Sequence, residues 1–168
     1  MNGPETHWRP MATGDLARVE AIAAIVHPGF FERPEIFAER LRLYPQGARL
    51  LARGPTALGY VLSHPWRDGA VPALDSLLGE LPAGARNYYL HDLALLPEAR
   101  GTGAAGRLVA ELVEHATKAG FFRMSLVAVN GSQDFWRRQG FSVLNVPELR
   151  QKLASYEAAA VFMVRPLA

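Results

Sequence analysis

The sequence predicts an α/β fold in which a mixed, twisted sheet of about six or seven strands is flanked by about four helices. Two observations lead to this class: short apolar segments of strand length alternate with longer segments of helical periodicity, and a glycine-rich loop joins one strand to one helix. The 168 residues, 49% hydrophobic and 20% charged, suit one domain spanning residues 1–168.

Charge and composition narrow the range of partners. A formal net charge of +2 gives no basis for expecting a nucleic-acid partner. The chain contains no cysteine, which excludes disulfides, a thiolate nucleophile and cysteine-ligated zinc. We find no apolar run of membrane-spanning length and no signal-peptide core, so we expect no membrane partner and, by default, a cytoplasmic location.

The N-terminal part alternates strand and helix signals. His27-Pro28-Gly29 ends the first helical pattern, Pro34 suits the first turn of the second, and Gly54-Pro55 suits a hairpin turn. Thr13-Gly14-Asp15 begins the first helix. The expected elements are a strand at 7–11, helices at 13–26 and 34–44, and strands at 48–53 and 57–64.

The connection over residues 65–87 holds three prolines and three glycines. We expect one short helix at 74–81 inside it, and its length between strands suggests a functional or mobile segment. Beyond the central unit described next, the expected elements are a strand at 123–129, a short helix at 132–139 and two closing strands at 141–146 and 158–165, joined by a long connection.

The central unit is a strand at 88–96, a loop with three glycines in six residues, and a helix at 104–118. Pro97 ends the strand because it has no N–H for a sheet ladder. One face of the helix is apolar, with the side chains of Ala105, Leu108, Val109, Leu112, Val113 and Ala116. Glycines allow close backbone approach to a ligand, and a helix start binds phosphate.

Two nucleotide motifs fit this loop poorly. Gly101-Thr102-Gly103-Ala104-Ala105-Gly106 matches G-x-G-x-x-G formally, but four residues separate it from the strand, and the next strand ends at Asn130 without a carboxylate. A Walker loop needs Lys-Ser or Lys-Thr after its last glycine, where this chain has Arg107-Leu108.

A third pattern fits well. Arg100-x-x-Gly103-x-Ala105 resembles the R/Q-x-x-G-x-G/A signature of the GNAT (GCN5-related N-acetyltransferase) superfamily. The segment Asn130–Phe141, which ends in aromatic, basic and Gly-Phe residues, is similar to that family's second conserved segment. One helix and one strand separate the two segments, in the family's order, and the close resemblance covers about residues 88–141.

The resemblance implies an acetyl-CoA-dependent N-acetyltransferase that transfers the acetyl group directly to a primary amine in a ternary complex. Backbone groups of the strand would hold the pantetheine arm, and amides of the loop would hold the pyrophosphate. The implied coenzyme A-binding residues are Leu93, Ala94, Leu95, Arg100, Gly101, Thr102, Gly103, Ala104, Ala105, Gly106, Asn130, Phe135 and Trp136.

A base must take the proton of the acceptor amine, whose pKa lies near 10. Family members commonly place a carboxylate on this strand, at positions that match Tyr89 or His91 here. His91 suits a base at neutral pH but could equally be a histidine bonded inside the sheet. We expect Tyr89 and His91 to share a strand face and Asp92 to face the other way as a structural carboxylate.

The acceptor side is indicated less directly. Candidate substrate-binding residues are Phe30 and Phe31 in the loop that matches the family's substrate-side connection, His64 and Trp66 at the start of the 65–87 connection, and Asp92 on the strand. The two phenylalanines could equally be hydrophobic anchors. The acceptor would be a small-molecule or peptide amine, and a homodimer is possible. The histidines show no metal-ligand spacing, so we expect no metal.

The chain departs from the family at one position. Where many members have a tyrosine that protonates the leaving thiolate, this chain has Trp136, whose indole has no useful acidity. Ser132 is the nearest hydroxyl, but a serine there is typical of a helix N-cap. The missing tyrosine allows a catalytically inactive CoA-binding module as an alternative. A dinucleotide-binding oxidoreductase and a purely structural interaction domain also stay open.

Overall fold

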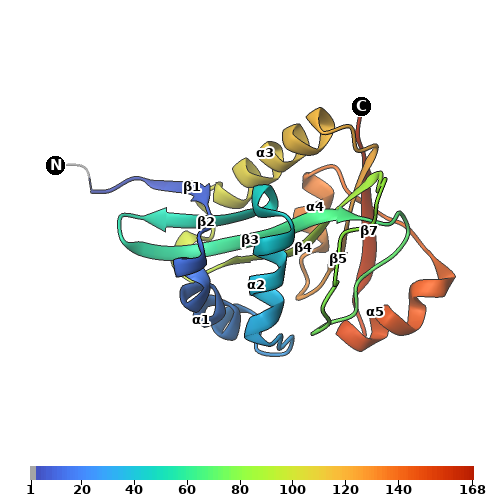
Figure 1. The fold of residues 1–168 in the computed structure, drawn as a ribbon, viewed down its shortest axis with the longest axis horizontal. Coiled ribbons are helices and arrows are strands. Elements are labelled where there is room, and N and C mark those ends of the chain that lie inside the picture. The colour runs from blue at the N-terminus through green and yellow to red at the C-terminus, as the bar shows by residue number, and fades with distance from the viewer. Residues whose placement is uncertain (1–2) are drawn as a thin grey trace.

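A computed structural model describes residues 3–168 as one seven-stranded mixed sheet with helices on both faces (Figure 1). The strands are β1 (Thr6–Pro10), β2 (Ala48–Arg53), β3 (Thr56–Trp66), β4 (Asn87–Leu95), β5 (Arg123–Ala128), β6 (Ser142–Val143) and β7 (Val161–Pro166). The α-helices are α1 (Leu16–Val26), α2 (Pro34–Leu43), α3 (Ala104–Lys118), α4 (Gln133–Arg138) and α5 (Arg150–Tyr156). The predicted fold class is confirmed.

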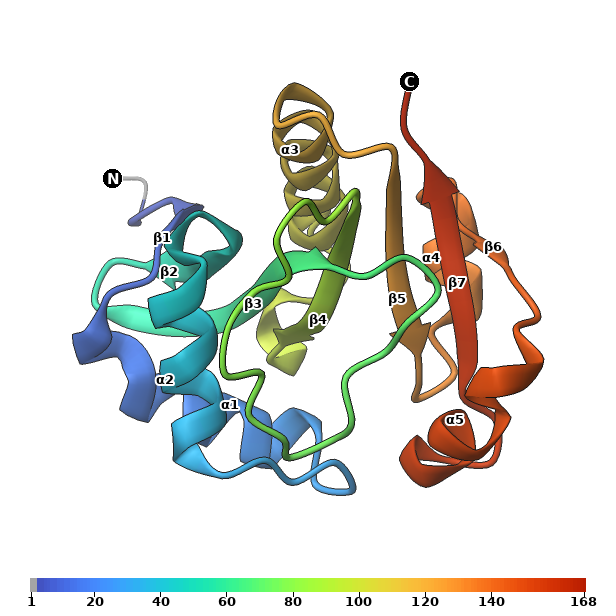
Figure 2. The same cartoon turned by 45° about the vertical axis from the view of Figure 1, so that its right-hand side comes forward.

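The sheet opens in its middle. Its strand order is β1-β2-β3-β4-β5-β7-β6, and only β4 and β5 are parallel neighbours. Those two strands pair over Asn87 to Tyr89 alone, although β4 continues to Leu95. Figure 2 shows β4 and β5 diverging from this point. The two halves of the sheet therefore leave a gap along the second half of β4.

Each face of the sheet is covered by different helices. α1 and α2 pack on the face that carries Tyr60, Leu62 and Ala94, and α3 and α4 pack on the opposite face, around Leu90 and Leu126. Four of the six residues on the predicted apolar face of α3 are buried, since Leu108, Val109, Leu112 and Ala116 are at most 2% exposed, and Ala105 and Val113 are partly buried. α5 covers the first of these faces farther along the sheet (Figure 2).

A β-bulge interrupts β4 beside the gap. In the β3–β4 pairing Leu62 lies opposite Asp92 and Ser63 lies opposite Leu90, so His91 has no partner of its own. An extra residue of this kind breaks the strict alternation of side chains. His91 and Asp92 consequently both face α1 and α2, and the expectation that Asp92 points away from His91 was wrong for this reason.

The connection between β3 and β4 has no helix, contrary to the one expected at 74–81. Side chains of α2 satisfy its backbone groups instead: Glu39 accepts the N–H groups of Leu78 and Gly79 at 2.7 and 2.9 Å, and Arg40 donates to the carbonyl of Ser76 at 3.2 Å. The segment is thus tied to α2. A helix was also missed, because α5 lies where only a connection was expected.

The start of α1 depends on a buried carboxylate. Asp15 accepts two hydrogen bonds from Arg9 and one from the N–H of Ala12, all at 2.8 Å. The hydrogen bond from Arg9 is the largest cause that lowers the pKa of Asp15 to about 2, from an ordinary value of 3.8. The resulting stabilisation is complete above the ordinary value and is lost as pH falls through about 2.

Asp15→Asn should therefore lower the free energy of unfolding by about 2 kcal/mol at pH 7 and by roughly half as much at pH 3. Urea unfolding at the two pH values measures this difference. Asp134→Asn is the matched control, because that carboxylate is 82% exposed and its pair with Arg137 should contribute little. An equal loss at both pH values would show that Asp15 acts by something other than its charge.

No helix in residues 3–168 combines the length and the apolar character needed to cross a lipid bilayer.

Candidate functional site

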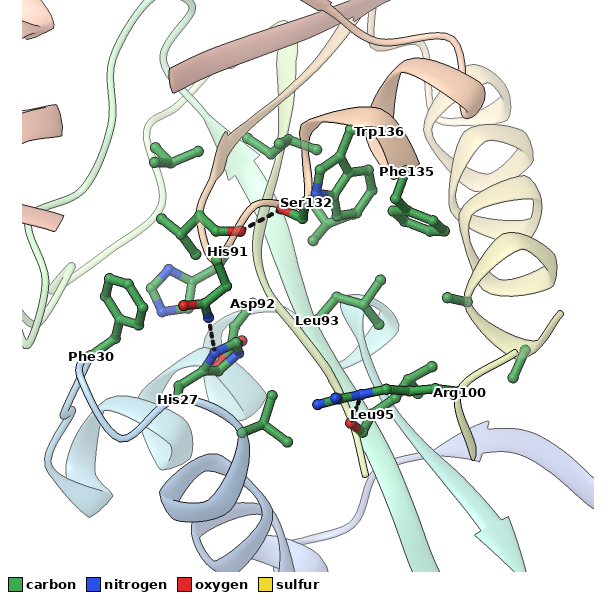
Figure 3. A pocket seen from close by; sticks show the side chains of 18 of the residues that line it. His27, Phe30, His91, Asp92, Leu93, Leu95, Arg100, Ser132, Phe135 and Trp136 are labelled. Atoms are coloured by element: carbon green, nitrogen blue, oxygen red, sulfur yellow. Dashed lines mark hydrogen bonds and ion pairs between the residues drawn. The ribbon is translucent and has the colours of Figure 1, made fainter. Parts of the chain in front are cut away.

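A cavity of about 730 Å³ occupies the gap between the diverging strands. Its lining comes from the second half of β4, the glycine loop, the start of α3, the end of β5, α4, and the α1–α2 loop. Figure 3 shows His27 and Phe30 on one side of it, opposite Phe135 and Trp136. The site therefore draws on both halves of the sheet.

The edge of β4 that faces the cavity is available for hydrogen bonds. β3 pairs with β4 as far as Leu95 on one side, whereas β5, within the described residues, pairs with it on the other side only up to Tyr89. Leu93 and Leu95 line the cavity. An unpaired strand edge binds an extended polar chain through main-chain groups, so this edge suits a linear ligand with amide bonds.

The glycine loop lies at the end of this edge. Gly101 and Gly103 have φ values of 72° and 82°, a region that favours glycine, and Gly103 is the N-cap of α3. Thr102 ties the loop down by donating to the carbonyl of Ala99 at 2.7 Å. The first-turn N–H groups of α3 have no intrahelical acceptors, so they form a site for an anion.

Cations surround the glycine loop. Arg100 donates from Nε to the carbonyl of Leu95 at 3.2 Å and lines the cavity (Figure 3). Arg138 also lines the cavity, whereas Arg137 is paired with Asp134 at 3.2 Å. The cavity lining thus offers the backbone of the glycine loop, Arg100 beside it, and a second guanidinium group from α4.

Aromatic side chains of α4 form the opposite wall. Trp136 is 6% exposed and stacks edge-on against Phe135 at 4.9 Å between ring centroids. Ser132 holds the N-cap position of α4, as expected, but its hydroxyl donates to the carbonyl of Val129 at 2.6 Å rather than capping the helix. This wall is therefore mainly apolar, and the hydroxyl proton of Ser132 is already donated to the carbonyl of Val129.

A first histidine–carboxylate pair contributes to the cavity wall and is almost fully buried. His91 Nε2 is 2.9 Å from Glu32 Oε1, and the two side chains are 2% and 6% exposed. Burial raises the pKa of Glu32, but the charge and hydrogen bond of His91 outweigh it, so the pKa falls below its ordinary value. Because the carboxylate can only accept, Nε2 carries the proton, and Nδ1 is left buried without a partner among the described residues.

A second pair is more open. His27, directly after α1, places Nε2 2.8 Å from Asp92 Oδ1, and the two side chains are 15% and 11% exposed. Tyr60 donates a hydrogen bond to the other oxygen of Asp92. Burial and the charge of Asp92 raise the pKa of Tyr60 well above its ordinary value, which keeps this hydroxyl protonated. Both His27 and Asp92 line the cavity.

Residues 17–141 match the family model described as acetyltransferase (GNAT) family. The match covers well over half of the chain. The protein belongs to the GNAT acetyltransferase family. A search of the curated proteins by sequence found no match.

Solved structures of GNAT proteins share the fold at low sequence identity. Ard1 from Thermoplasma volcanium is 13% identical, with a TM-score of 0.74 over 97% of this chain and 98% of that one. The loading GNATL domain of CurA from Lyngbya majuscula is 14% identical, with a TM-score of 0.81 over 96% and 98%. Arabidopsis thaliana Naa50, solved with the bisubstrate analogue CoA-Ac-MVNAL, is 13% identical, with a TM-score of 0.69 over 95% and 96%.

Most of the expected donor residues of this GNAT chain lie on the cavity wall. The lining includes Leu93, Leu95, Arg100, Gly101, Gly103, Ala104, Ala105, Gly106, Asn130, Phe135 and Trp136. Ala94 is 1% exposed and faces α1 and α2, so only its backbone belongs to the free edge. Thr102 is outside the lining and stabilises the loop through its hydroxyl.

The expected acceptor residues are scattered. Phe30, His91 and Asp92 reach the cavity. Phe31 is 72% exposed and lies outside the lining. His64, Trp66 and Tyr89 are buried beside one another on the face that carries His91, and none of the three reaches the cavity. Burial lowers the pKa of His64 to about 3, so this imidazole is neutral at physiological pH.

Sequence reasoning missed His27, Glu32 and Tyr156, which all line the cavity. In the sequence, His27 is recognisable only as part of the His27-Pro28-Gly29 break that ends a helix. Its partner Asp92 is 65 positions away and reaches it through the bulge, so no local pattern joins the two. Tyr156 belongs to the missed helix α5, and its hydroxyl donates to the carbonyl of Pro72 at 2.7 Å.

Proposed function

We propose that this GNAT protein transfers an acetyl group from acetyl-CoA to a primary amine by direct attack in a ternary complex. One observation carries the proposal: the free edge of β4 leads directly to the amides of the glycine loop. A linear ligand with amide bonds at one end and a pyrophosphate at the other would meet matching groups along this path.

The residues present suit coenzyme A. The backbone of Leu93 to Leu95 would hold the pantetheine arm, and the loop amides, with Arg100 and Arg138, would hold the phosphates. A β-carbon on Gly103 would lie 3.3 Å from Arg107 Nη1, in a backbone conformation that side chains rarely adopt. Bound there, acetyl-CoA would present an activated thioester at the far end of the cavity, beside the two histidine pairs.

The acceptor would approach from the side of the α1–α2 loop. Two imidazoles and two carboxylates gather there, and Ser132, the serine in the lining, already donates its hydroxyl proton to Val129, which suits direct transfer rather than an acyl-enzyme. The acceptor class, a small-molecule or peptide amine, is part of the proposal. One structural relative was solved with a peptide-like bisubstrate analogue. A homodimer remains a prediction from the sequence.

An inactive CoA-binding module is the second candidate. Trp136 takes the place of the tyrosine that protonates the thiolate in many relatives, and the Ser132 proton is committed to Val129. The thiolate of CoA can leave without a dedicated acid when the pH is near its own pKa, so the substitution does not by itself exclude catalysis. The family match gives no support to the dinucleotide-binding oxidoreductase.

A donor screen followed by an acceptor panel tests the proposal. We expect acetyl-CoA, but not NAD, to raise the unfolding temperature, and at least one primary amine to release free thiol from acetyl-CoA. Propionyl-CoA and malonyl-CoA in the same assay establish which acyl group is preferred. CoA binding without thiol release on any amine would favour the inactive module, and no response to CoA would contradict both candidates.

A further inference from the structure

His27 is the more exposed of the two imidazoles that line the cavity. Its side chain is 15% exposed, against 2% for His91, whose Nε2 is bound to Glu32 and whose Nδ1 is buried. A base must come within hydrogen-bond reach of the proton that it takes, directly or through one water. Accessibility therefore favours a histidine that no sequence motif singles out.

The contacts of His27 determine which ring nitrogen is free. Asp92 accepts from Nε2 at 2.8 Å, and because a carboxylate only accepts, Nε2 carries the proton of the neutral ring. Nδ1 then has a lone pair, and the side-chain amide nitrogen of Asn130 faces it at 3.4 Å. This contact is longer than an ordinary hydrogen bond, so a ligand can replace it at little cost.

Asp92 is itself held in place. Tyr60 donates to its second oxygen, and the bulge at His91 turns the carboxylate toward α1. A carboxylate fixed in this way orients the imidazole, selects its tautomer and stabilises the imidazolium that forms when Nδ1 is protonated. The three side chains form a line from the buried sheet to the cavity.

We propose that His27, oriented by Asp92, is the base that takes the proton of the acceptor amine. The inference rests on the proposed acetyl transfer. The nitrogen lone pair of the neutral amine forms the new C–N bond, the C–S bond breaks with its electron pair going to sulfur, and one N–H proton passes to Nδ1. His27 then releases this proton to solvent and the thiolate takes one up, so no net proton is consumed.

The charges around His27 suit this role. Burial lowers the pKa of His27, but the hydrogen bond and charge of Asp92, together with the charge of Glu32, raise it above its ordinary value of 6.5, while Arg100 opposes them. Asn130 and Phe30, from the other elements in contact with it, carry no charge. The base form is present above this raised pKa, so kcat/KM should rise with pH through an apparent pKa above 6.5.

Kinetics on an amine found in the acceptor panel provide the first test. His27→Ala should lose roughly 10²–10⁴ in kcat/KM, together with the rise at low pH, while the thermal shift caused by CoA is retained. His7→Ala is the matched control, because that exposed histidine lies on β1, away from the cavity, and should leave the rate unchanged. A His27→Ala enzyme with near wild-type rate and an unchanged pH profile would overturn the inference. If that variant is active and His91→Ala is not, the base is His91.

NMR titration of the histidine ring protons provides a second readout that needs no acceptor. His27 should titrate above pH 6.5 in the wild type, and Asp92→Asn should lower this value. A His27 that titrates at or below 6.5, or that does not respond to Asp92→Asn, would overturn the inference whatever the turnover. A wild-type protein that binds CoA but acetylates no amine would overturn both the proposed transfer and the role of His27. An active wild type together with an active His27→Ala variant would overturn only the role of His27.

Discussion

Gly103→Val should abolish the thermal stabilisation of the protein by acetyl-CoA. The wild type gains about 2.7 kcal/mol at a ligand concentration one hundred times the dissociation constant. Valine disfavours the φ of 82° at this N-cap, and its branched side chain would cover the amides at the start of α3. The variant should therefore fail to bind the donor and show no thiol release. Differential scanning fluorimetry with and without acetyl-CoA measures the effect.

A control variant must show that backbone strain from the valine does not by itself remove the response to acetyl-CoA. Gly120 lies just beyond the other end of α3 with a φ of 88°, and nothing lies within 4 Å of the position that a β-carbon would occupy there. Gly120→Val therefore imposes a comparable backbone cost of about 1–2 kcal/mol away from the cavity. We expect both variants to be destabilised and only Gly103→Val to lose the ligand response. A folded Gly103→Val protein with an unchanged shift would remove the glycine loop from the donor site.

Glu39→Ala should lower the free energy of unfolding by about 3–5 kcal/mol. Glu39 and Arg40 are 6% and 1% exposed in their side chains and form a 2.8 Å ion pair. The same carboxylate also accepts the N–H groups of Leu78 and Gly79. Its removal leaves a buried guanidinium without its nearest counter-charge and two amides without acceptors. Urea unfolding measures the loss.

The exposed pair of Arg49 and Glu111 is the comparison, because the two side chains are 31% and 49% exposed. Glu111→Ala should cost less than about 1 kcal/mol, since water replaces the partner. Glu39→Gln keeps an acceptor but removes the charge, so its cost should fall between the two. Similar losses for Glu39→Ala and Glu111→Ala would show that the buried network does not hold the 67–86 connection in place.

Local signals in the sequence were enough to predict most of the fold. The strand–loop–helix unit around Gly101 to Gly106 is encoded by neighbouring residues, and the apolar face of α3 by its own periodicity. The connection at 67–86 was predicted poorly because its conformation depends on Glu39 and Arg40, which are far away in sequence. α5 has seven residues and none that is fully buried, so it lacks a clear periodic signal.

The candidate site also has one part that local sequence signals predict and one part that they do not. The glycine-loop end of the cavity could be predicted, because its glycines and the start of α3 lie within one short segment of sequence. The end that holds the two histidine–carboxylate pairs could not be predicted, because His27 meets Asp92 and Glu32 meets His91 only after the sheet, α1 and the α1–α2 loop have come together. Strict alternation along β4 also predicted the wrong direction for Asp92, since a bulge leaves no clear mark in the sequence.

The bulge has a consequence for how this strand can change in length. Leu90 and Asp92 lie opposite consecutive residues of β3, Ser63 and Leu62. Deletion of His91 would therefore restore an uninterrupted ladder, and all remaining side chains of β4 would stay on their present faces. The β3–β4 ladder therefore does not need His91 for its pairing. The deletion would remove the partner of Glu32 and so destabilise the loop that Glu32 anchors, while β4 would pair with β3 as a regular ladder.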